Sequence, residues 1–372
     1  MKKLRITKEH PALLTSLLIM IPFLAAACSQ SPSAGNSSGD ASNEPTVEAT
    51  ASVDALDVAD EKLLEEAARA EGGEVMIYTS ITIDDLEEIL AEFNEAYTFT
   101  IPTYYRASGD DVIQKSMTEA KTGQHFADVF ETESFEVYRL MQAGLIQPFI
   151  SSESEVYSPK AKDPSGYWTV DRINPVVIGY NTELVEAADI PTTWEDLLDP
   201  KWKGKMGVEA NDVELLAGMV SVWGEARTYE FWEGIAAQDP GIIDGHTELA
   251  ELISAGEFAI APNLYAYRVE KLKAEGAPID WVRTDPVVTF SNILAMAADA
   301  PHPATAKLFI NWLLSEKGQN VFRELGRVPG RPGIQPDPPS LVEGLNLVFT
   351  VPAMAEDYNK YAEKWRSILN LE

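Results

Sequence analysis

Short apolar runs alternate with amphipathic stretches from residue 60 onward, and this alternation restricts the fold more than any other feature. Residues 74–79, EVMIYT, are typical of a buried strand. Over residues 86–93 the apolar side chains recur at three- and four-residue steps, which predicts a helix. A strand over 98–105 and a helix over 108–122, capped by Ser108, continue the series. Strands alternating with helices predict βαβ units and a parallel sheet covered on both faces, hence an α/β fold.

The same alternation continues to the end of the chain. Residues 127–130 predict a third strand, and Ser134 is placed to cap a helix that closes at Gly144. Residues 172–181 predict an extended strand that crosses into a second α/β series. This second series is expected to contain helices over 193–198, 213–223, 229–237 and 247–255, strands over 258–261 and 287–298, two helices within 303–325, and an amphipathic helix over 353–369.

Polar residues stand where the predicted strands of the first series end. In sheets of this kind, ligands bind beyond the carboxyl ends of the strands. The candidate site of the first series therefore contains Thr79, Ser80, Thr82, Glu131 and Glu133.

The first residues have the layout of an export signal. A basic start is followed by an apolar run over 12–27 that is too short to remain as a membrane span, so residues 1–27 are expected to be a signal peptide. Cys28 follows directly and is the only cysteine, which excludes intramolecular disulfides. The residues 24–28, LAAAC, resemble the lipobox of bacterial lipoproteins, which implies that Cys28 is acylated. An ordinary signal peptide with a chance cysteine is the alternative.

Residues 28–59 are rich in small and polar residues and contain no aromatic residue, so we expect a flexible, lipidated tether. No later segment approaches about 18 consecutive apolar residues. The protein is therefore expected to be exported and held to the cell membrane by lipid alone, facing the periplasm or the cell exterior. About 310 residues remain after the tether, which suits two lobes.

Charge and motifs narrow the function. The net charge is −30, which argues against nucleic acid as a partner because phosphate binding needs a basic surface. The sequence has no HExxH, GxSxG, Walker-type or GxGxxG motif, so we do not expect an enzyme. Glu131 and Glu133 lie two residues apart on one segment, so they do not face each other as glycosidase carboxylates do. A solvated loop is the favoured interpretation of this pair.

Four stretches, in this order along the chain, resemble the extracellular solute-binding family that includes the ferric-iron-binding periplasmic proteins. They are ADVFETE at 127–133, WEDLLDPKWKGK at 194–205, SAGEFAI at 254–260 and KLFINWLLSEKGQ at 307–319. The resemblance implies a monomeric binding protein that needs no cofactor and delivers its ligand to the permease and ATPase of an ABC importer. A sensory or adhesive module on the same fold is the alternative of another class.

The resemblance also implies a type II-like periplasmic-binding-protein fold, with two lobes joined by hinge strands and the ligand in the cleft between them. By this analogy, lobe 1 contains residues 60–171 and 285–335, and lobe 2 contains residues 172–284 and 336–372. The lobes would close around the ligand by a hinge motion.

For the ligand, the resemblance implies a ferric site made by a histidine, a glutamate and two adjacent tyrosines. Glu133 matches the glutamate and Tyr265 the second tyrosine, whereas Leu264 stands at the first tyrosine and Thr82 at the histidine. Tyr267 compensates if the segment is extended, since residues two apart then share a face, but the two tyrosines diverge if the segment is helical. Packing within a lobe is the other interpretation of these tyrosines.

Carboxylates occupy the stretch where iron binders of the family carry a Ser-Gly-rich turn for a co-bound anion. Asp212 and Glu214 stand there, at the start of a predicted helix, where the helix dipole alone would favour them. They would also repel phosphate. Together with Glu133 and the tyrosines they predict an oxygen-rich, acidic cleft, which fits a hard metal ion or an organic cation such as a polyamine. Ferric iron or an iron chelate is the favoured ligand.

Overall fold

The computed structural model describes residues 61–371. The predicted signal peptide, Cys28 and the tether lie outside the described residues. No helix in the described part of the chain is long and apolar enough to span a membrane.

The first α/β series follows the sequence pattern closely. Thr82 and Ser108 occupy the N-cap positions of the second and third helices, and Ser108 Oγ accepts a hydrogen bond from Asp111 N at 3.2 Å, as predicted. The predicted cap by Ser134 is wrong, because Glu133 holds the N-cap position and Ser134 is the first helical residue. The elements are α1 (Glu61–Glu71), β1 (Glu74–Thr79), α2 (Ile83–Ala96), β2 (Ile101–Arg106), α3 (Gly109–Lys121), β3 (Val129–Glu133), α4 (Ser134–Gln142) and β4 (Ile146–Gln147).

The main sheet has the order β11-β5-β10-β3-β1-β2. Strand β1 is parallel to both β2 and β3, as predicted, but β10 (Val287–Ala297) pairs antiparallel with β3 and with β5 (Thr169–Asn181). The sheet is therefore mixed. Strand β5 carries the chain out of the first series and β10 returns it, so these two strands run in opposite directions.

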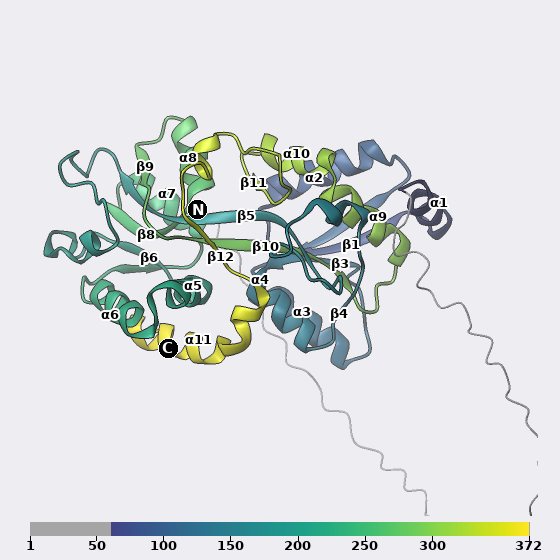
Figure 1. Ribbon diagram of the computed structural model, residues 1–372, viewed down its shortest axis with the longest axis horizontal. Helices are drawn as coiled ribbons and strands as arrows, with labels where there is room; N and C mark the ends of the chain where they lie inside the picture. The colour runs from purple at the N-terminus through teal and green to yellow at the C-terminus, as the bar shows by residue number, and fades with distance from the viewer. Residues whose placement is uncertain (1–60, 372) are drawn as a thin grey trace, which may run out of the picture. The chain divides into compact units, whose positions relative to one another are not determined.

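Strand β5 is the crossing strand that the sequence predicts, and it starts three residues earlier than expected. Its first half pairs with β10, up to Pro175, and its second half pairs with β8 (Ile260–Tyr265) and β9 (Ile279–Val282). All of its residues are buried. Figure 1 shows β5 and β10 running through the middle, with β8, β9 and α5–α8 at one end and β1, β3 and α9 at the other.

The second series keeps the predicted order of the elements that were expected, with differences in bounds and with further elements between them. The predicted helix over 193–198 is a short 3₁₀ helix, and the predicted strand over 258–261 extends to Tyr265. The further elements of this series are 3₁₀ helices at Glu195–Leu198 and Pro200–Trp202, β6 (Gly207–Glu209), α5 (Val213–Trp223), α6 (Glu225–Ala236), β7 (Gly241–Ile243), α7 (His246–Ala255) and α8 (Ala266–Ala274).

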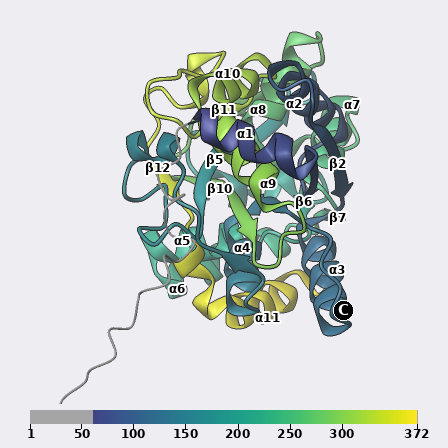
Figure 2. The same cartoon turned by 90° about the vertical axis from the view of Figure 1, so that its right-hand side faces the viewer.

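The C-terminal third contributes to both ends of the molecule. Helix α9 (Pro303–Leu314) packs along α1 (Figure 2), where Glu71 accepts hydrogen bonds from the first backbone N–H groups of α9. Helix α11 (Tyr358–Leu369) packs on α5 and α6, and its Trp365 ring lies 4.7 Å from that of Trp232. The remaining elements are α10 (Glu316–Glu324), β11 (Val328–Pro329), β12 (Leu347–Phe349) and short 3₁₀ helices at Ser152–Val156, Pro339–Leu341 and Pro352–Asp357.

Candidate functional site

A cavity of about 990 Å³ lies where the ends of strands from the two series meet. Its walls come from the residues after β1, from the end of β3, from the starts of α5 and α7, and from the junction of β8 with α8. Thr79 and Glu131, by contrast, are buried beneath it and do not line it. The cavity is lined by all the ligand residues expected from the sequence, namely Ser80, Thr82, Glu133, Asp212, Glu214, Tyr265 and Tyr267.

Tyr265 and Glu133 are in direct contact, although they come from different series. The Tyr265 hydroxyl donates to Glu133 Oε1 at 2.7 Å, and the tyrosine is 8% exposed. Burial and the charge of Glu133 hold the pKa of Tyr265 well above its ordinary value. The phenol is therefore protonated unless a strongly polarising ligand removes its proton.

Leu264 cannot take the place of a second cavity tyrosine. Side chains alternate along β8, so Leu264 and Tyr265 face opposite sides. Leu264 is fully buried, and a Cβ at Gly179 on β5 would lie 2.4 Å from its Cδ1, which shows how closely the two strands approach there. The side chain at this position belongs to the core.

Tyr267 reaches the cavity although it is helical. Strand β8 ends at Tyr265 and Tyr267 is the second residue of α8, yet the two rings stack with centroids 5.9 Å apart. The expectation that a helical segment would separate them is wrong, because the strand-to-helix junction turns the chain between them. On its other side, Tyr267 is covered by the Arg327 guanidinium, 3.7 Å from the ring centroid.

Thr82, at the position expected for a histidine ligand, is engaged elsewhere. Its Oγ1 accepts a hydrogen bond from Arg327 Nη2 at 3.1 Å, and Arg327 forms a buried ion pair with Asp85 in the first turn of α2. Neither the threonine nor this arginine is therefore free of protein partners.

His246 supplies an imidazole that the sequence analysis missed. It is the first residue of α7, and its ring lies against that of Tyr265 with centroids 3.8 Å apart. Its Nε2 is 3.0 Å from Asp212 Oδ1 and its Nδ1 is 3.0 Å from Asn263 O. Burial would lower the pKa of His246, but the charges of Asp212 and Glu209 raise it to about 10. Only the position of His246 at a predicted helix start, after Gly245, could have indicated it.

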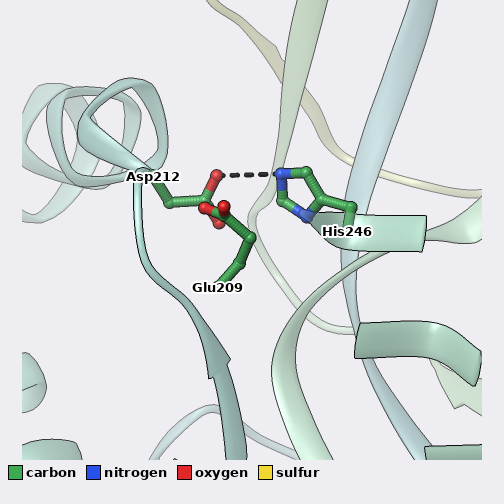
Figure 3. A group of neighbouring side chains, drawn as sticks. All are labelled: Glu209, Asp212 and His246. Carbon is green, nitrogen blue, oxygen red and sulfur yellow. Dashed lines mark ion pairs between the residues drawn. The ribbon is translucent and has the colours of Figure 1, made fainter. Parts of the chain in front are cut away.

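Glu209, Asp212 and His246 form a compact group of possible metal ligands, with one ligand atom of each within 4.8 Å of the others (Figure 3). Glu209 ends β6 and Asp212 precedes α5. Burial, followed by the charge of Asp212, raises the pKa of Glu209 to about 7. Asp212 does not cap its helix through its side chain, since its carboxylate contacts His246 and Asn263 instead.

A second group contains Glu133, Glu136 and Glu214, again with ligand atoms within 4.8 Å of one another. Glu214 Oε1 accepts hydrogen bonds from Ser134 Oγ, at 3.0 Å, and from Thr350 Oγ1. Burial and the neighbouring carboxylates raise the pKa of Glu214 well above its ordinary value and that of Glu136 to about 8.

Three arginines also line the cavity, and each has partners within the protein. Arg106 donates to Ile81 O at 2.9 Å, and Arg327 pairs with Asp85. Arg172, on β5, is paired with Glu131, while its Nε has no hydrogen-bond partner among the described residues. The interpretation of Glu131 as part of a solvated loop is therefore wrong, because it lies on β3, where burial is compensated by Arg172.

Comparison with known proteins places this fold and cavity among proteins that bind solutes outside the cytoplasm. Residues 110–349 match the model of the bacterial extracellular solute-binding protein family, and the chain belongs to that family. It is thus a periplasmic-type solute-binding protein of ABC-type transport with no enzymatic role, as the sequence predicted.

One curated relative is iron uptake protein A2 of Synechocystis sp., 27% identical over 256 residues, which cover 62% of this chain and 72% of the relative. Among solved structures, iron-bound HitA from Pseudomonas aeruginosa superposes with a TM-score of 0.71 at 20% identity, covering 79% of this chain and 99% of HitA. AfuA from Actinobacillus pleuropneumoniae, with fructose-6-phosphate bound, gives a TM-score of 0.72 at 20% identity, covering 81% and 99%. These likenesses confirm the periplasmic-binding-protein fold. The ligands differ, since HitA contains iron and AfuA contains fructose-6-phosphate.

Proposed function

We propose that this protein captures ferric iron, free or as a chelate, and delivers it to the permease and ATPase of an ABC importer. The observation that carries the proposal is the continuous contact of Glu133, Tyr265, His246 and Asp212 in a buried part of the cavity. Carboxylate, phenolate and imidazole are donors that suit a highly charged hard metal ion. His246 supports the proposal because its ring offers an imidazole to the group once the incoming metal displaces its proton, and Thr82 offers none.

Capture by closure of two lobes is part of the proposal. Lobe 1 would contain residues 60–171 and 285–335, and lobe 2 residues 172–284 and 336–372. Strand β5 supports this division, since its first half pairs with β10 and its second half with β8 and β9. Under this division the hydrogen bond between Tyr265 and Glu133 joins the two lobes. Opening of the lobes would separate these two iron-binding residues.

We further propose that the protein works as a monomer anchored by an acylated Cys28, for example through palmitate, with residues 28–59 as the tether. The apolar run and the small residues before Cys28 support this part of the proposal.

Visible absorption of the ferric complex tests the metal site. Full-length protein mixed with ferric citrate should develop a phenolate-to-iron charge-transfer band. The Tyr265→Phe variant should lose most of this band, because its ring packs equally well but has no oxygen. Tyr104→Phe is the matched control, since Tyr104 lies on the surface and contacts Glu87. A band that Tyr265→Phe leaves unchanged would contradict a role for this tyrosine.

An organic cation such as a polyamine is the second candidate, and the size and charge of the cavity favour it. A volume of about 990 Å³ greatly exceeds that of one ion, and carboxylates such as Asp244, Glu248 and Glu251 extend the acidic wall beyond the Tyr265 contacts. Calorimetric titration with spermidine and with ferric citrate separates the two. Heat with spermidine, together with no heat and no colour with iron, would replace the iron proposal.

A further inference from the structure

Three carboxylates meet where two helices begin. Glu133 is the N-cap residue of α4 and Glu136 lies in the first turn of the same helix. Glu214 lies in the first turn of α5. One carboxylate oxygen of each lies within 4.8 Å of the other two, and all three residues line the large cavity. We call these residues the carboxylate trio.

Two oxygens of the trio are buried without a hydrogen-bond partner. Glu214 is 5% exposed, and although its Oε1 accepts from Ser134 and Thr350, its Oε2 has no partner in the described chain. Glu136 Oε2 is in the same state. A buried polar atom left unpaired carries its full desolvation cost, so a proton, a water or a cation at these two oxygens would be stabilising.

No basic side chain within residues 61–371 forms an ion pair with any member of the trio, whereas three other buried carboxylates in or beneath the cavity have one. Asp85 pairs with Arg327, Glu131 pairs with Arg172, and Asp212 pairs with His246. A buried carboxylate without a countercharge is strongly disfavoured, and three adjacent ones add mutual repulsion. The trio therefore lacks a positive charge that the rest of the cavity already has.

We propose that Glu133, Glu136 and Glu214 bind a hard divalent cation of the size of Ca²⁺. The donors are all oxygens, which such ions prefer. Ca²⁺ takes six to eight oxygens at about 2.3–2.6 Å in a flexible geometry, so it can adapt to three carboxylates whose oxygens lie within 4.8 Å of one another. Mg²⁺ binds at about 2.0–2.1 Å and demands a near-ideal octahedron, which three carboxylates fixed on two different helices are less suited to provide.

This cation site goes beyond the proposed iron site and does not depend on it. Glu133 touches both, since its Oε1 accepts from Tyr265, whereas Glu136 and Glu214 form no hydrogen bond or ion pair with Tyr265 or His246. Because Glu133 and Glu136 precede β5 and Glu214 follows it, the cation connects the starts of α4 and α5 from the two chain segments that form the cavity walls.

Calcium titration tests the proposal on full-length protein freed of metal with a chelator. In 0.15 M KCl, where diffuse charge attraction is screened to about 8 Å, equilibrium dialysis with radioactive Ca²⁺ should show one saturable site per chain. Glu214→Gln and Glu136→Gln should each raise the Kd about tenfold or more, because Ca²⁺ affinity follows the number of ligand charges. Ca²⁺ should also raise the thermal midpoint of the wild type, and the same Ca²⁺ concentration should raise that of Glu214→Gln less.

Two controls make the result specific. Glu248→Gln removes one exposed carboxylate from the same cavity and should bind Ca²⁺ like the wild type. Tyr265→Phe should also retain Ca²⁺ binding, so that failure of the iron proposal and failure of this one are separate results. Absence of saturable binding, unchanged binding by folded Glu214→Gln, or equal losses in Glu214→Gln and Glu248→Gln would overturn the proposal. The proposal would also be overturned if the protein did not bind Ca²⁺ but bound the organic cation propylammonium at a saturable site that Glu214→Gln abolishes.

Discussion

Replacement of Arg172 by methionine tests how strongly the sheet beneath the cavity depends on one buried charge. Arg172 is 2% exposed and donates to Glu131 and to Asp171, both of which are also buried. Methionine has a similar length and no charge, so Arg172→Met leaves two carboxylates without their cation. The sheet pairing of β5 with β10 at this position involves backbone groups and is retained.

The size of the effect follows from the geometry. Arg172 Nη1 lies 3.4 Å from Asp171 Oδ2, and at an effective dielectric constant of about 20 two unit charges at this distance attract by about 5 kcal/mol. Removing one partner of a buried ion pair typically costs about 3–5 kcal/mol. We therefore expect Arg172→Met to lower the free energy of unfolding by about 4 kcal/mol at pH 8.

The loss should be smaller in mild acid. Burial, together with the charge of Glu131, already raises the pKa of Asp171 to about 7. A carboxyl group whose pKa is higher in the folded than in the unfolded chain costs stability as the pH rises from the unfolded value towards the folded value. Without Arg172 the pKa of Asp171 rises further, so at pH 5 protonation should relieve about 1 kcal/mol or more of the deficit.

Urea unfolding, followed by tryptophan fluorescence and by far-ultraviolet circular dichroism, measures these differences when the two transitions coincide. The matched control is the triple variant Arg172→Met, Glu131→Gln, Asp171→Asn, which contains no buried charge at this position. It should recover most of the lost stability, because an uncharged set of similar volume avoids the desolvation cost. The reasoning is refuted if Arg172→Met unfolds within about 1 kcal/mol of the wild type at pH 8, or if the triple variant is no more stable than the single one.

Two further outcomes are expected. Gly179→Ala should lower the free energy of unfolding by about 1–3 kcal/mol, since its Cβ would lie 2.4 Å from Leu264 Cδ1, and an added Leu264→Val should restore part of the loss in urea unfolding. Equal stability of Gly179→Ala and wild type would show that β5 and β8 can move apart. Cys28→Ser should transfer the exported protein from the membrane to the soluble fraction on centrifugation, whereas continued membrane association would place the anchor elsewhere.

The order of the secondary structure could be predicted from the sequence because each element carries its own periodic pattern. Helix α5 has the predicted bounds, and most of β5 is predicted as an extended strand over 172–181. The direction of β10 could not be read in this way. A buried strand has the same composition whether its neighbours run parallel or antiparallel, and the pairing of β10 with β3 and β5 is decided by contacts far apart in sequence.

The candidate site was predicted in part for the same reason. Glu133 could be placed at the cavity because it ends a predicted strand, and Tyr265 because of the family resemblance, but His246 reaches Tyr265 from the start of another helix. The local pattern around His246 contains no sign of this contact. For Tyr267 the local pattern was misleading. Its helical position predicted that its ring would point away from that of Tyr265, whereas the turn between β8 and α8 brings the two rings together.

The distribution of countercharges explains why we expect the cavity to bind cations despite the three arginines in its walls. Arg172 and Arg327 are neutralised by Glu131 and Asp85, so an anion would have to compete with carboxylates that are already in place, although Arg172 Nε is a buried donor without a partner in the described chain. Glu136 and Glu214 have unpaired oxygens, and neither forms an ion pair within residues 61–371. An anion would increase the repulsion at these carboxylates, whereas a cation removes it. The charge of the ions that the cavity prefers is therefore set by which charges the protein leaves uncompensated, and the number of acidic or basic residues in the walls is a poorer guide.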